Sequence, residues 1–357
     1  MFSRIIIKVG TKVLTDKDGK LDCAIIQNLV EQIIAIRNQG CEVVLVTSGA
    51  VGSGRALLKR DGHEETMSDK QVYAAVGQVA LMNIYAGYLA KYDIQSAQIL
   101  VTKEDFRDRV HYQNMEACFF NVLRKNVLPI VNENDVVSVK ELIFTDNDEL
   151  TSLVALQLNA DAVFILTSVE GVIAGEINDP NAKIISEIGI EDLRDAEKFV
   201  TNDKSSGGRG GMVTKFAVAR KMISAGITVF MLNGKTPNGI LSIFQGKQLG
   251  TKFSPVRRIS SHKRRIAHGD TLARGTIVVN RCVEDKIFTS KIAMSLLPVG
   301  IIAAQGEFIK GDIVRIKTES GRTIGCGISK ADAESVNKTA GTRGGRVVIH
   351  YDDLFVY

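Results

Sequence analysis

The sequence predicts an α/β protein with a mostly parallel sheet sandwiched by helices, followed by a small C-terminal all-β domain. Apolar runs alternate with amphipathic helical stretches through residues 1–250, a pattern typical of a parallel sheet covered on both faces. From about residue 251 the pattern changes to short β-branched runs separated by glycines. The length of 357 residues exceeds one ordinary core and favours two domains.

Six apolar runs give the predicted strands of the first domain, and helical stretches separate them. The strands are expected at 4–9, 42–49, 96–102, 127–135, 162–168 and 227–232. The helices are expected at 24–38, 71–91, 111–125, 149–158 and 212–225, where apolar residues recur at helical spacing. In such a sheet ligands bind beyond the carboxyl ends of the strands. The residues that follow each strand are therefore the candidates for function.

The charge pattern supports a division of the chain near residue 255. Residues 251–357 hold 18 Lys and Arg against 10 Asp and Glu, so the net charge of +5 arises in the C-terminal part. Much of the excess lies in a charged stretch with little periodicity, as expected of a linker. We expect the large domain at 1–255, a basic linker at 256–274 and the small domain at 275–357.

The composition indicates a cytoplasmic protein without a membrane partner. Hydrophobic residues make up 45% and charged residues 24%, which is ordinary for a soluble globular chain. No continuous apolar run approaches the roughly 18 residues that a membrane span needs, and the N-terminus lacks the order of a signal peptide. The five cysteines are scattered without paired spacing and His residues are few, so we expect reduced thiols and no protein metal site.

The segments after the strands are rich in residues that handle phosphate. Lys8 and Gly10 end the first strand, and Ser48 follows the second. A glycine-rich stretch at 206–211 opens the helix that carries Lys215. Glycines let backbone N–H groups approach an anion, a helix N-terminus adds its dipole, and lysines neutralise a transferring phosphoryl group.

Each of these features also has a simpler structural explanation. Lys8 is equally consistent with a charge on an edge strand. Taken alone, Asn147 and Asp148 are better explained as a helix N-cap with a favourable dipole contact. A glycine-rich stretch such as 206–211 is more often a flexible turn than a ligand site. The functional interpretation is favoured because all of these groups fall at the same end of one predicted sheet.

The same segments resemble a known family in their order and spacing. They are Lys8-Val-Gly-Thr, Thr47-Ser-Gly-Ala-Val, Asn132-Glu-Asn-Asp135, Asp146-Asn-Asp148 and Gly210-Gly-Met-x-Thr-Lys215, and they resemble the glutamate-phosphorylating branch of the amino acid kinase family. The C-terminal runs Ser295-Leu-Leu-Pro-Val-Gly-Ile, Gly306-Glu-Phe and Lys310-Gly-Asp-Ile-Val resemble a PUA domain. The resemblance implies an amino acid kinase fold at 1–255 and a PUA-like domain at 275–357.

The resemblance also implies an activity and its cofactors. The enzyme would phosphorylate the γ-carboxylate of L-glutamate with ATP and Mg²⁺, giving γ-glutamyl 5-phosphate for proline biosynthesis. It further implies proline as a feedback inhibitor, a homo-oligomer, and glutamate-5-semialdehyde dehydrogenase as a possible partner.

Residue roles follow from the resemblance, position by position. Lys8 and Lys215 would stabilise the transferring phosphoryl group, and Asp148 would orient them. The residues that would hold glutamate are Ser48, Asp135 and Asn147, with Asp135 facing the α-ammonium. The ATP-binding set would be Lys8, Gly10, Thr167, Ser168, Arg209, Gly210, Gly211, Met212 and Lys215. Ser168 and Arg209 depart from the family pattern, which usually has Asp and Thr at these positions.

Two alternatives remain open from the sequence. A sister kinase of the same fold would act on acetylglutamate, UMP, carbamate or aspartate, although Asn132-Glu-Asn-Asp135 favours free glutamate. An RNA-binding protein would use the PUA-like domain and a basic cluster whose positive charges would contact the phosphates of the RNA backbone. The cluster consists of Arg257, Arg258, Lys263, Arg264 and Arg265. A solvated linker is the simpler interpretation of that cluster.

Overall fold

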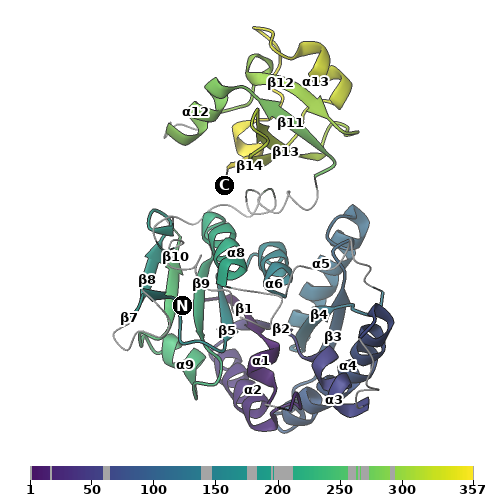
Figure 1. Ribbon diagram of the computed structural model, residues 1–357, viewed down its shortest axis with the longest axis vertical. Helices are drawn as coiled ribbons and strands as arrows, with labels where there is room; N and C mark the ends of the chain where they lie inside the picture. Colours follow the sequence, from purple (N-terminus) through teal and green to yellow (C-terminus); the bar gives the residue numbers. More distant parts are fainter. Residues whose placement is uncertain are drawn as a thin grey trace. The chain divides into compact units, whose positions relative to one another are not determined.

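The computed structural model divides into two compact units (Figure 1). It describes residues 2–16, 18–58, 65–137, 147–174, 183–193, 196, 212–255, 263, 266, 273–289 and 294–356. The first unit comprises 1–105 with 110–257, and the second comprises 106–109 with 258–357. Most of the linker expected at 256–274 lies outside the described residues, including Arg257, Arg258, Arg264 and Arg265. The domain limits therefore stay a prediction.

The first unit contains an eight-stranded sheet in the order β3-β4-β2-β1-β5-β9-β10-β8. The strands are β1 (Arg4–Val9), β2 (Glu42–Thr47), β3 (Ser96–Val101), β4 (Leu128–Glu133), β5 (Ala162–Thr167), β8 (Glu187–Gly189), β9 (Thr228–Asn233) and β10 (Thr251–Ser254). The run from β3 to β9 is parallel, and β10 pairs antiparallel with β9. All six predicted strands are confirmed. The short β8 and β10 were not predicted, and a two-stranded ribbon of β6 (Ile173–Ala174) and β7 (Lys183–Ile184) stands apart.

Helices cover the sheet, as the alternating pattern predicts (Figure 1). The described helices are α1 (Thr11–Leu14), α2 (Cys23–Arg37), α3 (Ala50–Leu58), α4 (Met67–Ala90), α5 (Arg109–Arg124), α6 (Asn147–Gln157), α8 (Met212–Ser224) and α9 (Gly239–Phe244). Local sequence explains where several begin. The Asp22 side chain accepts hydrogen bonds from the first N–H groups of α2, and Thr66 and Asp69 form a capping box at α4.

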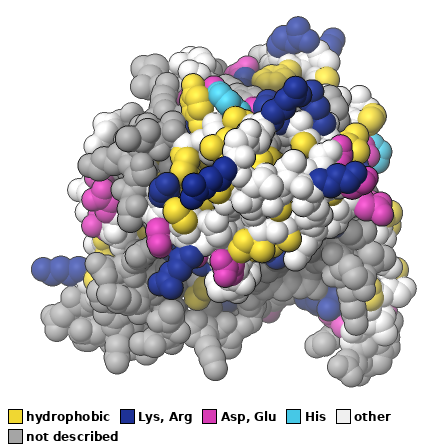
Figure 2. Space-filling view, turned by 90° about the horizontal axis from the view of Figure 1, so that it is seen from above, with side chains coloured by type: hydrophobic (Ala, Val, Ile, Leu, Met, Phe, Trp, Pro, Cys, Tyr) yellow, Lys and Arg dark blue, Asp and Glu magenta, His cyan; other side chains and the backbone are white. Residues whose placement is uncertain are grey.

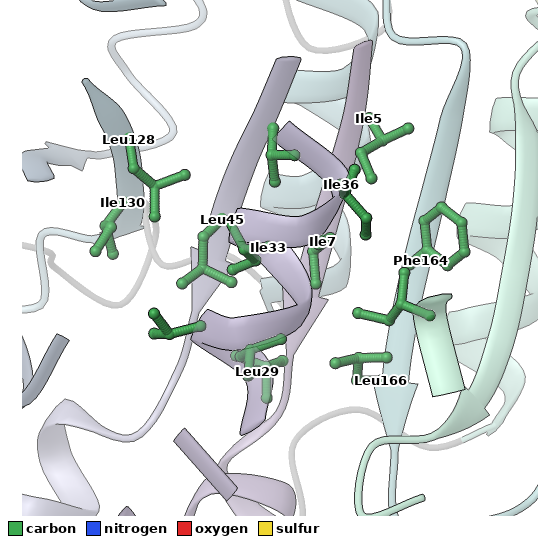
Figure 3. Packing of buried hydrophobic residues seen from close by; sticks show 14 of the residues in the cluster. Ile5, Ile7, Leu29, Ile33, Ile36, Leu45, Leu128, Ile130, Phe164 and Leu166 are labelled. Carbon is green, nitrogen blue, oxygen red and sulfur yellow. The ribbon is translucent and has the colours of Figure 1, made fainter. Parts of the chain in front are cut away.

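The main hydrophobic core lies between α2 and the central strands (Figure 3). Leu29, Ile33 and Ile36 recur at helical spacing along α2 and point at β1, β2 and β5. Ile5 and Ile7 alternate along β1 on this face, and both are fully buried. Burying each such side chain contributes roughly 1.5–3 kcal/mol, so this layer fixes β1 in the middle of the sheet.

The glycines after β2 serve helix packing. Gly49 has a positive φ of +104°, which only glycine adopts easily, and the chain is helical from Ala50 onward. A Cβ on Gly54 would overlap the backbone of Tyr73 in α4, and one on Gly77 would overlap the backbone of Ala50. Gly54 and Gly77 therefore let α3 and α4 cross at backbone contact.

Helix α4 has the length and apolar composition of a membrane span, which the search for continuous apolar runs did not predict. A single helix of this kind is weak support for a membrane, because core helices of soluble proteins pass the same test. One face of α4 buries Leu81, Tyr85 and Leu89 in the core around α2. That packing accounts for the apolar residues on this face without a bilayer.

The second unit has its own five-stranded sheet in the order β12-β11-β13-β14-β15. The strands are β11 (Gly275–Val279), β12 (Ile301–Gln305), β13 (Ile313–Thr318), β14 (Thr323–Ile328) and β15 (Leu354–Val356). The predicted separate β domain is confirmed, with a core of its own. The structure adds α12 (Arg281–Thr289) and α13 (Ala333–Thr339), whose short, charged sequences gave no clear helical pattern.

Most of the basic cluster behind the RNA alternative lies outside the described residues, so the structure does not test that alternative. In Figure 2 the Lys and Arg side chains of the described residues form several separate groups between apolar side chains. Exposed apolar side chains of the second unit include Ile302 and Ile309, at 47% and 68%.

Candidate active site

Two lysines and one aspartate meet beyond the carboxyl ends of the central strands. Lys8 lies in β1, between β2 and β5, so it is not an edge-strand charge. Its Nζ lies 2.6 Å from Asp148 Oδ1, and Lys215 Nζ lies 3.1 Å from Asp148 Oδ2. The Asp148 side chain is fully buried, and the two lysine side chains are 7% and 13% exposed. One carboxylate therefore holds two ammonium groups, one on each of its oxygens.

The electrostatics of this cluster favour the charged form of Asp148. Burial by itself raises the pKa of Asp148, but the charges of Lys8 and Lys215 and their hydrogen bonds outweigh it and hold that pKa below its usual value. Asp148 is also the second residue of α6, where the helix dipole favours a negative charge. Two positive charges against one negative charge leave a net positive site, which suits an anionic ligand.

Local structure explains how residues so far apart in sequence meet. Lys8 extends from β1, near its carboxyl end. Asp148 lies in the first turn of α6, and Lys215 lies in the first turn of α8. Helix α6 contacts both β1 and α8, which brings the first turns of the two helices near the end of β1. The structure brings the predicted residues Lys8, Asp148 and Lys215 together.

A chain of side-chain amides lies beside the charged cluster. Asn147 Nδ2 lies 2.9 Å from the Thr47 carbonyl oxygen, 2.7 Å from Ser48 Oγ and 3.1 Å from Asn132 Oδ1. Asn132 in turn donates from Nδ2 to Gln78 Oε1 at 2.9 Å. The network joins β2, β4, α4 and α6. It brings together the predicted substrate residues Ser48 and Asn147.

The other predicted site residues border the same sheet end or lie outside the described residues. Asp135 is half-buried in the turn after β4. On the nucleotide side, Gly10 precedes α1, and Met212 begins α8. Thr167 is buried at the end of β5 and its neighbour Ser168 is exposed. Arg209, Gly210 and Gly211 lie outside the described residues.

Sequence reasoning missed three members of the site. Asn132 was recognised as part of a motif but not as a site residue. Gln78 gave no signal, because it lies within an apolar helical pattern. Lys103, just after β3, pairs with Glu149 at 2.7 Å next to Asp148, and only the fold brings them together.

The described residues do not gather a metal site of their own. Within the described ranges, no group of three or more His, Cys, Asp or Glu side chains is placed to hold a metal ion. The Asp148 carboxylate is engaged by two lysines, so its oxygens are poorly suited to a cation.

Comparisons with known proteins identify the family. The amino acid kinase family model matches residues 3–233, and the PUA domain model matches residues 275–350. The glutamate 5-kinase of Chlorobaculum tepidum is 42% identical over 100% of this chain and 98% of its own length. That of Bacteroides thetaiotaomicron is 41% identical over 99% of each chain.

A solved structure supports the fold. The carbamate kinase of Giardia lamblia bound to AMP-PNP matches 71% of this chain and 98% of its own, with a TM-score of 0.52 and 21% identity. At that identity the likeness concerns the fold alone. The sequence relatives extend over both domains, and the chain therefore belongs to the amino acid kinase family, within its glutamate 5-kinase group and with a C-terminal PUA domain.

Proposed function

We propose that this protein transfers the γ-phosphoryl group of ATP to the side-chain carboxylate of L-glutamate, producing γ-glutamyl 5-phosphate and ADP. The observation that carries the proposal is the buried group of Lys8, Asp148 and Lys215 at the carboxyl ends of the strands. The glutamate 5-kinase relatives, which match the whole chain, support the choice of substrate.

The chemistry of the acceptor explains why the site holds cations and no obvious general base. A glutamate side chain with an ordinary pKa of about 4.3 is already a carboxylate at neutral pH, so no proton has to be removed before it attacks. Its oxygen forms a bond to the γ-phosphorus while the bond from that phosphorus to the β–γ bridging oxygen breaks and ADP leaves. What the protein must supply is fixed positive charge along this path.

Lys8 and Lys215 would supply that charge from opposite sides. In the absence of substrate, Asp148 holds both ammonium groups, 2.6 and 3.1 Å from its two oxygens. The lysines are therefore positioned before the substrate arrives, and little reorganisation is needed during the reaction. Their partial exposure leaves each a side from which a phosphate oxygen can approach.

Ser48, Asn147 and Asp135 would bind glutamate. Ser48 and Asn147 are already hydrogen bonded to each other at the ends of β2 and α6. Asp135 lies in the turn after β4, where its carboxylate would pair with the α-ammonium. This arrangement would favour free glutamate over N-acetylglutamate, because acetylation removes that ammonium charge. UMP and carbamate lack an amino-acid ammonium altogether.

Magnesium would enter with the nucleotide. The described residues gather no acidic cluster for it, and Mg²⁺ commonly keeps several waters and binds through substrate phosphates. Its contribution would be to neutralise charge on the phosphate oxygens. Proline inhibition, homo-oligomer formation and a partnership with the next enzyme of the pathway stay predictions from the family resemblance.

The test is direct. The purified protein is incubated with ATP, Mg²⁺ and glutamate, and the acyl phosphate is trapped with hydroxylamine as the hydroxamate. Glutamate-dependent hydroxamate is expected. ATP consumption only with another acceptor, such as N-acetylglutamate or carbamate, would replace this proposal with a sister kinase.

A further inference from the structure

Three side-chain amides beside the active site, those of Asn147, Asn132 and Gln78, are joined by hydrogen bonds whose donors and acceptors can be assigned. Asn147 Nδ2 faces the backbone carbonyl oxygen of Thr47, and a carbonyl oxygen only accepts hydrogen bonds. The atom of Asn147 at this position must therefore be the NH₂ group. The atom of Asn132 that faces the same NH₂ group must then be its oxygen, so the Asn132 NH₂ group faces Gln78.

Gln78 accepts the last hydrogen bond of this series. Its Oε1 is the only hydrogen-bond acceptor recorded for the Asn132 NH₂ group within the described residues, at 2.9 Å. The Gln78 side chain is more than nine-tenths buried, and its own NH₂ group has no hydrogen-bond partner among the described residues. An unpaired buried NH₂ group costs about 1–3 kcal/mol, so a purely structural role would be better served by an apolar side chain.

The backbone around Gln78 is held in place. Its neighbour Gly77 touches the backbone of Ala50, only two residues beyond Ser48, so closely that a Cβ at position 77 would overlap it. Helix α4 is thus pinned against the loop that carries the predicted substrate residue. Gln78 can therefore transmit orientation rather than simply fill space.

At the other end of the series, the Asn147 amide determines whether the Ser48 hydroxyl donates or accepts a hydrogen bond. Ser48 Oγ accepts a hydrogen bond from Asn147 at 2.7 Å. Its hydroxyl hydrogen is then available to a different acceptor, and a substrate carboxylate is such an acceptor. If the Asn132 amide rotated, its NH₂ group would face the NH₂ group of Asn147 and disturb the hydrogen bond from Asn147 to Ser48.

We propose that Gln78 is a positioning residue for the acyl acceptor: by accepting from the Asn132 NH₂ group it keeps the Asn132 oxygen turned toward Asn147. The Asn147 NH₂ group then stays on Ser48, and the Ser48 hydroxyl donates to the substrate carboxylate. The inference rests on the proposed function for the identity of that carboxylate. It assigns Gln78 no contact with ATP, and the two substrates should therefore respond differently to its replacement.

The test compares two replacements at position 78 with one control. Gln78→Met keeps a similar length and removes the acceptor. Gln78→Glu keeps an oxygen that accepts from Asn132. Gln157→Met makes the same change at another buried glutamine, which donates to the Tyr112 carbonyl oxygen from the far end of α6, about 15 Å along the helix from Asn147.

Steady-state kinetics should separate the variants. Gln78→Met is expected to raise KM for glutamate about tenfold, the equivalent of one hydrogen bond of about 1.4 kcal/mol, with KM for ATP unchanged. In Gln78→Glu, KM for glutamate should be closer to the wild-type value than it is in Gln78→Met. Gln157→Met should lower the melting temperature and leave both KM values alone. An unchanged KM for glutamate in Gln78→Met, or an equal rise for both substrates, would overturn the proposal.

A second comparison covers the case in which Gln78→Met does not fold. Gln78→Glu alone keeps the hydrogen bond, whereas Gln78→Glu combined with Asn132→Asp sets two acceptors against each other. KM for glutamate should then rise by more than the product of the two single effects, and a simple product would refute the inference. If the wild-type protein proves to use another acceptor, the proposed function fails, and the same variants are judged by KM for that acceptor.

Discussion

Asp148→Asn should lower the stability of the protein, and bound nucleotide should recover part of the lost stability. The replacement keeps the shape of the side chain but removes the negative charge that holds Lys8 and Lys215. Two ammonium groups then remain close together with no anion between them. Triphosphate can restore the missing negative charge, so bound nucleotide should stabilise this variant more than it stabilises the wild type.

The magnitude follows from the burial of the cluster. The Asp148 side chain is fully buried and both lysine side chains are at least 87% buried. Removing one partner of such a buried ion pair costs about 3–5 kcal/mol. In a domain of this size each kcal/mol lowers the melting temperature by about 2–4 °C. The expected decrease is therefore roughly 6–20 °C.

Thermal unfolding with and without a non-hydrolysable ATP analogue measures both effects. Glu149→Gln is the matched control, because Glu149 is the next residue of α6 and pairs with Lys103 in a less buried position. Its cost should be about 1 kcal/mol or less. Equal melting temperatures for Asp148→Asn and wild type, or a smaller shift with the analogue in the variant, would refute this account of the cluster.

Three further predictions concern the same site. Lys215→Ala should lower kcat by about 10²–10³, the usual loss when one fixed charge on the transferring group is removed; a wild-type kcat in a steady-state assay would exclude it from the site. N-acetylglutamate should give little hydroxamate compared with glutamate, and equal yields would contradict the pairing proposed for Asp135. Because the pKa of Asp148 is lowered in the folded protein, its stabilising contribution is complete above the unfolded value of about 3.9 and is lost as pH falls through the folded value. The gap in melting temperature between wild type and Asp148→Asn should therefore close only in strongly acidic buffer, and a gap that closes near neutrality would assign the effect to another group.

The strands and the main helices were accessible from the sequence because burial imposes a local pattern. A strand covered on both faces is apolar throughout, so the runs RIIIKV and AVFILT could be recognised as strands without knowing their position in the sheet. The sheet pattern predicted that the charged groups of Lys8, Asp148 and Lys215 lie at one end, because parallel strands collect their carboxyl ends at one edge, and the family resemblance implied the pairing of Asp148 with the two lysines. The sequence could not show that β1 lies between β2 and β5. That position buries Lys8 inside the sheet instead of leaving it on an edge strand.

The amide chain and the roles of the glycines depended on contacts between distant segments. Gln78 looks like one polar residue on an apolar helix, and its meaning comes from Asn132, which lies 54 residues later. Gly54 and Gly77 look like flexible residues until α3 and α4 are seen to cross at them. The sequence by itself determined which segments form strands and helices and which charged groups lie at their ends, because those properties follow from local burial. Only the tertiary structure decided which donor faces which acceptor, because a hydrogen bond depends on the relative position of two side chains to within a few tenths of an ångström.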